Sequence, residues 1–512
     1  MRRSIILFFL ILAISFGTNA QQSANTLVVN ADKGKDTISK YIYGHFTEHL
    51  GRCIYGGIWV GKNSPIPNTR GIRNDILDAL KAIRVSIVRW PGGCFADTYH
   101  WMDGIGPAEK RPKFVNTNWG GVVEDNSFGT HEFLDFCELL GAEPYLSINI
   151  GSGTIKEARD WVEYVNSDND SPMANLRRLN GRNKPWKVKF WGIGNETWGC
   201  GGNMTPEYYS NVYKQFSTFC PGEYKILAGG TPDDLDWTET IMKATKKNPE
   251  LIQGYSYHNY TICHTWAKKG AAVNFDESEW FNTMQKTTFV DNDLTKHSSI
   301  MEKYDPEKKI GVIADEWGNW FDVEPGDNPA FLYQQNTLRD AITAALYLNI
   351  YNNHCSRVKM ANIAQMVNVL QSVILTRENK IVLTPTYYVF KMYAVHQDAV
   401  LLPIEVKCEE YSSGNDTIQS LSVSASKDKN GKIHISIANL DPIQGKKLSC
   451  EIHGTAAKNV SGEIITADKM NAYNDFGKPE EVKILPFTGT RIQKGILSVD
   501  LPAKSIVMLE LD

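Results

Sequence analysis

The stretch Trp191-Gly192-Ile193-Gly194-Asn195-Glu196 decides the fold, because it is an apolar strand that ends in an Asn-Glu pair. The apolar run begins near Val188, as expected of a strand buried on both faces. A second run, 309–315, ends directly before Glu316. In a closed barrel of parallel strands, catalytic side chains lie at the carboxyl ends of different strands. We therefore expect both glutamates at the same end of one barrel.

A pair of strand-end carboxyl groups, Glu196 and Glu316, indicates cleavage of a glycosidic bond. One carboxylic acid protonates the leaving oxygen, and one carboxylate stabilises or traps the positively charged sugar carbon. The acid must stay protonated until attack, so the two groups need different surroundings. On position alone, two ordinary acids in ion pairs are an equally good interpretation, since structural networks also use such residues.

Apolar runs typical of buried strands recur along the chain with helical patterns between them. The runs lie near 41–46, 84–89, 143–149, 188–194, 224–229, 252–257, 310–315 and 358–363. Helical spacing is seen at Ile72, Ile76, Leu77, Leu80 and Ile83. Thr205-Pro206-Glu207 has the N-cap hydroxyl and first-turn proline of a helix start. Eight alternations predict an α/β fold, a (β/α)8 TIM barrel, rather than a doubly wound sheet with its Gly-rich phosphate turn.

The pattern changes after about residue 397. Segments 421–426, 434–438 and 505–511 alternate or run apolar as strands do, and Asn430-Gly431 is a hairpin turn signal. We interpret 397–512 as a C-terminal β-sandwich and 41–396 as the barrel. A strand within 21–40 precedes the barrel and is a candidate to join the sandwich.

Composition and the first residues suggest an exported protein with an uncharged partner. The chain has 512 residues, 42% of them hydrophobic, and a formal net charge of −4, so no nucleic acid partner is expected. Arg2-Arg3, an apolar run over 5–16 and Thr18-Asn19-Ala20 resemble a signal peptide over 1–20. We expect a periplasmic or extracellular protein with no membrane association after cleavage; an uncleaved anchor is the alternative.

Nine cysteines are scattered singly and cannot all pair, so at least one thiol is free in a monomer. No CxxC pair exists, which argues against a zinc ribbon or a redox motif. His258, Cys263 and His264 match no metal-site spacing. We expect neither a metal nor a cofactor.

Seven stretches together resemble the α-L-arabinofuranosidases of glycoside hydrolase family 51. They are 43–51 (YGHFTEHLG), 89–95 (RWPGGCF), 101–107 (WMDGIGP), 194–196 (GNE), 315–317 (DEW), 361–365 (ANIAQ) and 384–387 (TPTY). The resemblance covers almost the whole chain after residue 20, in the family's order. It implies a barrel with an appended β-sandwich, a homo-oligomer and a retaining exo-glycosidase. The substrate would be terminal α-L-arabinofuranose on arabinoxylan, arabinan or derived oligosaccharides.

The resemblance also implies roles for single residues. Glu196 is similar to the general acid/base and Glu316 to the nucleophile. The substrate-binding residues that it implies are Glu48, Cys94, Asn195, His258, Tyr260, Trp320 and Gln365. Asn195 would donate to the sugar 2-hydroxyl. Many relatives have Asn where this chain has Cys94, so a thiol there would make a weaker or differently aimed contact.

Some of these positions have a structural alternative. Glu48 could serve a surface ion pair, and lone His or Tyr residues at strand ends are more often satisfied core groups. Trp119 and Trp320 are candidates to stack on the substrate beyond the cleaved bond, but tryptophan is mostly a packing residue. Two other functions stay open, namely a related endoglucanase or xylan-active glycosidase and, less favoured, a catalytically inactive carbohydrate-binding protein.

Overall fold

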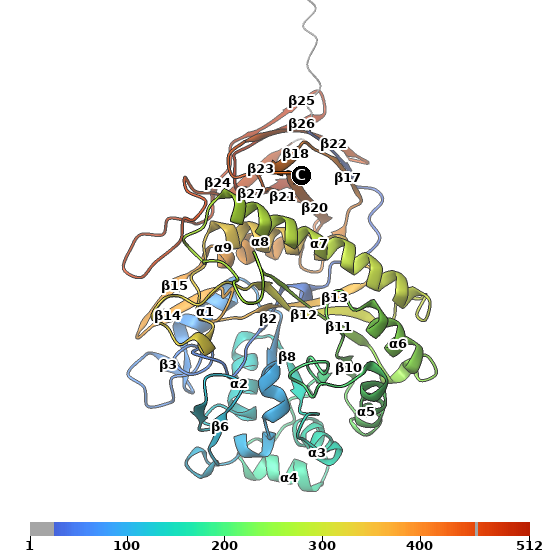
Figure 1. The fold of residues 1–512 in the computed structure, drawn as a ribbon, viewed down its shortest axis with the longest axis vertical. Helices are drawn as coiled ribbons and strands as arrows, with labels where there is room; N and C mark the ends of the chain where they lie inside the picture. The colour runs from blue at the N-terminus through green and yellow to red at the C-terminus, as the bar shows by residue number, and fades with distance from the viewer. Residues whose placement is uncertain (1–24, 456–458) are drawn as a thin grey trace, which may run out of the picture.

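A closed barrel of eight parallel strands forms the centre of the protein (Figure 1). The computed structural model describes residues 25–455 and 459–512, so the predicted signal peptide lies outside the described residues. The strands are β2 (Gly44–Phe46), β5 (Ile87–Trp90), β8 (Glu143–Ile148), β9 (Phe190–Ile193), β10 (Tyr224–Leu227), β11 (Gly254–Thr261), β12 (Gly311–Asn319) and β13 (Val358–Ala364). Pairing of β13 with β2 closes the ring. The predicted barrel is confirmed.

Helices surround the barrel between successive strands (Figure 1). They are α1 (Asn74–Ala82), α2 (Thr130–Leu140), α3 (Ile155–Asn166), α4 (Pro172–Leu179), α5 (Pro206–Phe219), α6 (Leu235–Thr245), α7 (Glu277–Glu302), α8 (Leu338–Asn353) and α9 (Pro385–Tyr393). The hydroxyl of Thr205 accepts the Tyr208 N–H and so begins α5, as its sequence predicts.

Three local predictions were wrong at element boundaries. Residues 40–43 form a 3₁₀ turn, and β2 begins only at Gly44. Ile72 lies in a short hairpin of β3 (Asn68–Thr69) with β4 (Ile72–Arg73), because it pairs with Thr69 before α1 begins. Strands β11 and β12 stay paired beyond the apolar runs, so polar residues such as Glu316 lie inside a strand.

The barrel interior is packed at the end opposite the predicted site. Six strands each contribute one buried side chain: Ile87, Tyr145, Phe190, Ile226, Ile313 and Met360. Bulky layers of this kind fill a barrel of eight strands, so it is a core and not a pore. The open end is therefore the carboxyl end of the strands.

The strand-rich C-terminal region consists of two main sheets. One sheet has the order β17 (Ile404–Lys407), β1 (Asn25–Asn30), β22 (Lys446–His453), β26 (Ile496–Leu501) and β25 (Thr490–Gln493). The other has the order β16 (Val400–Leu401), β20 (Leu421–Lys427), β21 (Ile433–Asn439), β27 (Ser505–Leu511), β23 (Val460–Ile465) and β24 (Leu485–Pro486). The first strand, β1, runs antiparallel to β17 and parallel to β22.

Three further hairpins join β6 (Phe114–Asn116) to β7 (Val122–Glu124), β14 (Ile374–Arg377) to β15 (Lys380–Leu383) and β18 (Glu410–Ser413) to β19 (Asp416–Gln419).

Helix α8 lies between the barrel and the C-terminal sheets (Figure 1). All its residues from Leu338 to Asn352 are buried, which explains why it lacks a polar face. Asn349 donates to the carbonyl of Ser422 in β20, and the Trp280 indole of α7 donates to the Leu440 carbonyl. Buried hydrogen bonds and apolar packing therefore fix the two parts against each other.

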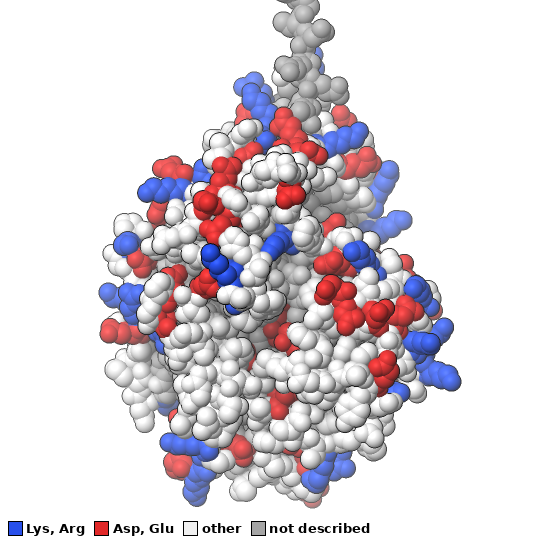
Figure 2. Space-filling view, in the orientation of Figure 1, with Lys and Arg blue, Asp and Glu red and all other residues white. Residues whose placement is uncertain are grey.

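Acidic and basic side chains are interspersed over the face shown in Figure 2. A mixed surface of this kind fits a neutral partner better than a polyanion. Within residues 25–455 and 459–512, the longest apolar helical stretches fall short of a membrane span.

Candidate active site

The carboxyl ends of the barrel strands surround a cavity of about 750 Å³. Of the nine residues predicted for the site, eight line this cavity: Glu48, Cys94, Glu196, His258, Tyr260, Glu316, Trp320 and Gln365. The ninth, Asn195, is buried beside it and contacts the guanidinium of Arg89. The structure thus brings together residues that lie up to 317 positions apart in the chain.

Glu316 lies in β12 and is held by two donors. Arg89 Nη1 donates to its Oε1 at 2.7 Å, and the Tyr260 hydroxyl donates to its Oε2 at 2.7 Å. Only 6% of Glu316 is exposed. The carboxylate is therefore oriented by charge-assisted hydrogen bonds, and its negative charge is compensated by Arg89.

Arg89 is the main residue of the site that our sequence reasoning missed. It is 1% exposed, donates to Asn195 Oδ1 at 2.7 Å and lies 3.6 Å from Asp315 Oδ2. Burial alone would lower the pKa of Arg89, but Asp315 and Glu316 raise it overall. A charged residue inside the apolar strand β5 was the available signal, since buried charges are normally paired.

Glu196 follows β9 with a positive φ of 39° and receives a hydrogen bond from a histidine. His258 Nδ1 lies 3.0 Å from Glu196 Oε1, and its Nε2 lies 3.3 Å from Asp315 Oδ1. Burial would lower the pKa of His258, but Glu316, Asp315 and Glu196 raise it to about 10. The imidazolium then donates from both nitrogens at neutral pH.

Asp315 is a further buried acid between these cations. Burial would raise its pKa, but Arg89 and His258 hold it at about 2. The hydroxyls of Ser256 and Tyr145 also donate to its two oxygens. Asp315 is thus a fixed anion that orients His258 and Arg89 below the cavity.

Glu48 is 2% exposed and accepts four hydrogen bonds. Its donors are the backbone N–H groups of Gly93 and Phe95, the Trp119 indole and the Gln365 amide. Burial and the charge of Glu316 nevertheless raise the pKa of Glu48 to about 7. The alternative reading of Glu48 as a surface ion pair was therefore wrong.

Aromatic side chains form the rim of the cavity. Trp320 packs edge-on against Tyr260 with ring centroids 5.1 Å apart, and Trp266 packs edge-on against Trp320 at 5.3 Å. Trp266 is 62% exposed, and Phe289 of α7 is also exposed at this rim. Exposed aromatic side chains around an open cavity are typical of a binding surface.

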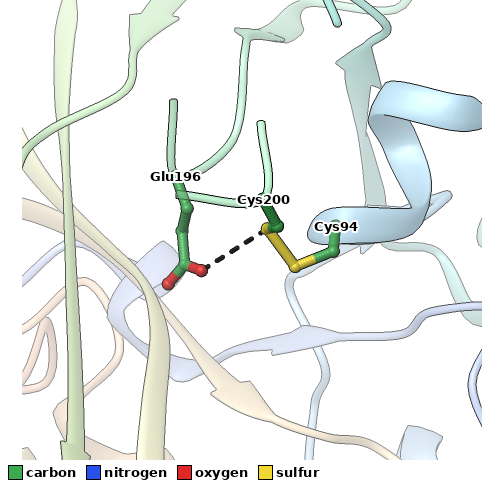
Figure 3. Close-up of side chains that lie close together, drawn as sticks. All are labelled: Cys94, Glu196 and Cys200. Carbon is green, nitrogen blue, oxygen red and sulfur yellow. Dashed lines mark hydrogen bonds between the residues drawn. A yellow bond between two sulfur atoms is a disulfide. The ribbon is translucent and has the colours of Figure 1, made fainter. Parts of the chain in front are cut away.

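Cys94 forms a disulfide bond with Cys200, which Figure 3 shows beside Glu196. Our expectation of a free thiol at position 94 was therefore wrong. The ends of β5 and β9 bring the two Cα atoms within 5.5 Å, although the cysteines are 106 positions apart in sequence. The other seven cysteines are free. No spacing rule could have selected this pair from nine scattered cysteines.

Comparison with known proteins agrees with this architecture. Residues 79–278 match the family described as "Alpha-L-arabinofuranosidase 1 domain", and 315–505 match "Alpha-L-arabinofuranosidase C-terminal domain". The chain is 53% identical to an intracellular exo-alpha-L-arabinofuranosidase of Bacteroides ovatus, over 100% of both chains.

Solved structures of the family have the same fold. The GH51 arabinofuranosidase of Xanthomonas axonopodis pv. citri is 47% identical, with a TM-score of 0.94 over 95% of this chain and 99% of that one. The alpha-L-arabinofuranosidase of Thermotoga maritima, solved as an arabinose complex, is 32% identical, with a TM-score of 0.84 over 95% and 99%.

One prediction is contradicted by one of these relatives. The Bacteroides protein, which aligns over the full length, is named as intracellular, against the signal peptide and the export that we predicted. That prediction depended only on the composition of the first twenty residues, a pattern that does not by itself establish a destination. On sequence, fold and site arrangement together, the chain belongs to the α-L-arabinofuranosidases of glycoside hydrolase family 51.

Proposed function

We propose that the protein is a retaining exo-α-L-arabinofuranosidase that releases terminal arabinofuranose from arabinoxylan, arabinan or oligosaccharides derived from them. One observation carries the mechanism: a carboxylate oxygen of Glu196 and one of Glu316 lie within 4.8 Å of each other at the same cavity. Retaining enzymes have carboxyl groups about 5–5.5 Å apart, whereas inverting enzymes need about 6.5–9.5 Å for an intervening water.

Glu316 is the proposed nucleophile. Its two oxygens are aimed by Arg89 and Tyr260, so that one can attack the anomeric carbon while the other keeps a donor. A fixed, desolvated carboxylate of this kind avoids the cost of reorientation during attack. The product of this step is a glycosyl ester on Glu316, with the leaving alcohol released.

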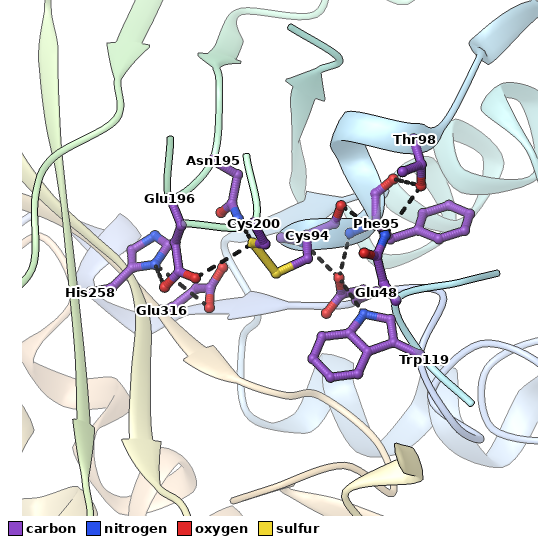
Figure 4. The surroundings of a disulfide bond; sticks show 12 residues. Glu48, Cys94, Phe95, Thr98, Trp119, Asn195, Glu196, Cys200, His258 and Glu316 are labelled. Atoms are coloured by element: carbon purple, nitrogen blue, oxygen red, sulfur yellow. Dashed lines mark hydrogen bonds and ion pairs between the residues drawn. A yellow bond between two sulfur atoms is a disulfide. The ribbon is translucent and has the colours of Figure 1, made fainter. Parts of the chain in front are cut away.

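Glu196 is the proposed acid/base. It is half-buried at the cavity wall, where His258 donates to Oε1 and leaves Oε2 facing the disulfide (Figure 4). In the first step Glu196 gives its proton to the glycosidic oxygen. In the second step it removes a proton from water, which attacks the ester and restores the original configuration.

Several buried groups are available to bind the furanose hydroxyls. The Oδ1 of Asn195 accepts from Arg89, so its amide N–H₂ is the group left to donate to the sugar 2-hydroxyl. The Oε1 of Gln365 is buried without a protein partner, whereas its Nε2 is bound to Glu48. A buried acceptor of this kind normally has a partner, and a sugar hydroxyl would supply one.

Two carboxylate variants and added azide test the mechanism. Glu316→Ala should lose turnover of every arabinofuranoside, because no ester can form. Glu196→Ala should still be glycosylated by substrates with activated aryl leaving groups, and azide should restore turnover to give the α-arabinosyl azide. Glu207→Ala, an exposed acid on α5, is the matched control.

Three results would contradict the proposal. Inverted arabinose from the wild-type enzyme, seen by NMR before mutarotation, would exclude retention. Azide rescue that gives the β-azide from Glu196→Ala would reverse the roles. Faster turnover of aryl glucosides or xylosides than of arabinofuranosides would favour the alternative of an endoglucanase or xylan-active enzyme. Sedimentation would test the homo-oligomer that the family leads us to expect.

A further inference from the structure

The disulfide of Cys94 with Cys200 joins the two loops that carry opposite sides of the site (Figure 4). Cys94 begins the turn after β5, where the N–H groups of its neighbours Gly93 and Phe95 both bind Glu48. Cys200 lies in the loop after β9, four residues beyond Glu196. The bond thus connects the loop that holds Glu48 to the loop that holds the proposed acid/base.

The two ends of this bond are held by different hydrogen bonds. On the Cys94 side, Asn118 also donates to the Cys94 carbonyl, so this turn is fixed without the disulfide. On the Cys200 side, the N–H groups of Gly199 and Gly201 bind the carbonyl of Glu196. Both hydrogen bonds lie within the loop that contains Cys200, so a displacement of Cys200 also displaces the backbone of Glu196.

The disulfide also touches the reacting group itself. Cys200 Sγ lies 3.7 Å from Glu196 Oε2 and 3.8 Å from Asn195 Nδ2, so it forms part of the wall against which both side chains pack (Figure 4). Breaking the bond removes the covalent connection between the loop of Glu196 and the turn of Cys94, so the loop of Glu196 gains freedom to shift.

This disulfide is accessible in a way that the remaining cysteines are not. Cys200 is exposed and Cys94 lines the substrate cavity, whereas six of the seven free cysteines are buried and Cys408 is half-buried. A thiolate can reach an exposed sulfur but not a buried one.

From these contacts we infer that the Cys94–Cys200 disulfide positions Glu196 for proton transfer and makes the enzyme's activity sensitive to thiol reductants. A dithiol attacks Sγ of Cys200, the sulfur of Cys94 leaves as a thiolate and takes a proton, and the second thiol then releases Cys200. The protein gains two thiols, and the dithiol is oxidised to its disulfide, which balances two electrons and two protons.

This inference depends on the proposed role of Glu196. A shift of about 1 Å at a catalytic group can cost about 100-fold in rate. Reduction should therefore lower kcat/KM about 100-fold on an arabinose-containing oligosaccharide, whose leaving alcohol needs the proton. It should change kcat/KM less than about threefold on a dinitrophenyl arabinofuranoside, whose leaving group needs none. A disulfide that only stabilised the fold would affect both substrates equally.

The test measures kcat/KM on these two substrates before and after treatment with dithiothreitol. Alkylation of the folded protein, followed by mass spectrometry, counts the new thiols. Oxidised glutathione should restore the lost activity. Cys200→Ala should have the activity of the reduced enzyme, and dithiothreitol should not change that activity further. If Cys200→Ala does not fold, Cys94→Ala replaces it in the same test. Cys408→Ser should keep the wild-type response.

Two results would overturn the inference: two new thiols with an unchanged ratio between the substrates, or purified enzyme in which residues 94 and 200 are already thiols at full activity. Failure of the proposed function would look different. In that case Glu196→Ala itself would lose both substrates to the same extent.

Discussion

Removal of His258 is expected to damage activity and the pH dependence of stability together. His258 is the buried cation that lies 3.0 Å from Glu196, 3.3 Å from Asp315 and 3.7 Å from Glu316. In His258→Ala, Glu196 loses a charge-assisted hydrogen bond worth about 1.5–3 kcal/mol. Because 1.36 kcal/mol is tenfold in rate, kcat/KM should fall about 10- to 150-fold.

The same residue makes a predictable contribution to the free energy of unfolding. Its pKa is raised from 6.5 to about 10 in the folded protein, which corresponds to roughly 5 kcal/mol at most. Because the folded pKa lies above the unfolded one, this stabilisation is complete below pH 6.5. It is lost as the pH rises towards 10.

Denaturant unfolding of wild type and His258→Ala at pH 6.5 and pH 9.5 measures this effect. The difference in unfolding free energy between the two proteins should be smaller at pH 9.5. His354→Ala is the matched control, because His354 is bound to Asp291 and does not line the cavity. His258→Gln, which keeps a neutral donor, should recover part of the activity. A pH-independent difference, together with activity within threefold of wild type, would refute the reasoning.

Three other changes should have distinct effects. Glu48→Gln should lower kcat/KM about 10- to 100-fold through the lost charge. Because burial and Glu316 raise the pKa of Glu48 from 4.5 to about 7, the same variant should stabilise the protein by roughly 3 kcal/mol at pH 8. Calorimetry should show that this gain disappears as the pH falls towards 4.5. Trp266→Ala should raise KM for oligosaccharides but not for an aryl arabinofuranoside, and equal effects would remove the exposed indole from substrate binding. A chain ending after residue 396 should be insoluble or inactive because it leaves α8 uncovered, and a soluble, active fragment would contradict this.

The barrel could be predicted because its strands are buried on both faces and therefore stand out as apolar runs. The positions of Glu196 and Glu316 at the ends of apolar runs could be predicted for the same reason, whereas their catalytic roles stay a prediction. Arg89 could not be recognised as a site residue in this way, because it was considered only as part of a motif. Its three partners, Glu316, Asn195 and Asp315, are distant in sequence.

Other features depend on contacts that local sequence does not encode. The disulfide needs the ends of β5 and β9 to meet, and the uniform burial of α8 needs a sheet on one side and the barrel on the other. The boundary between the two regions near residue 397 stays a prediction. Strand lengths were underestimated in β11 and β12 because polar residues such as His258 and Glu316, which line the cavity, follow their apolar runs.

The position of β1 constrains the order in which the protein can fold during synthesis. Asn25, in the first described strand, donates to the carbonyl of Lys447, 422 residues later. Until β17 and β22 leave the ribosome, β1 has neither of its neighbours and exposes unpaired backbone groups on both edges. All eight strands of the barrel leave the ribosome earlier, since the last of them ends at Ala364. The unpaired edges of β1 are therefore the segment that should depend most on protection by a chaperone for a good yield of folded enzyme.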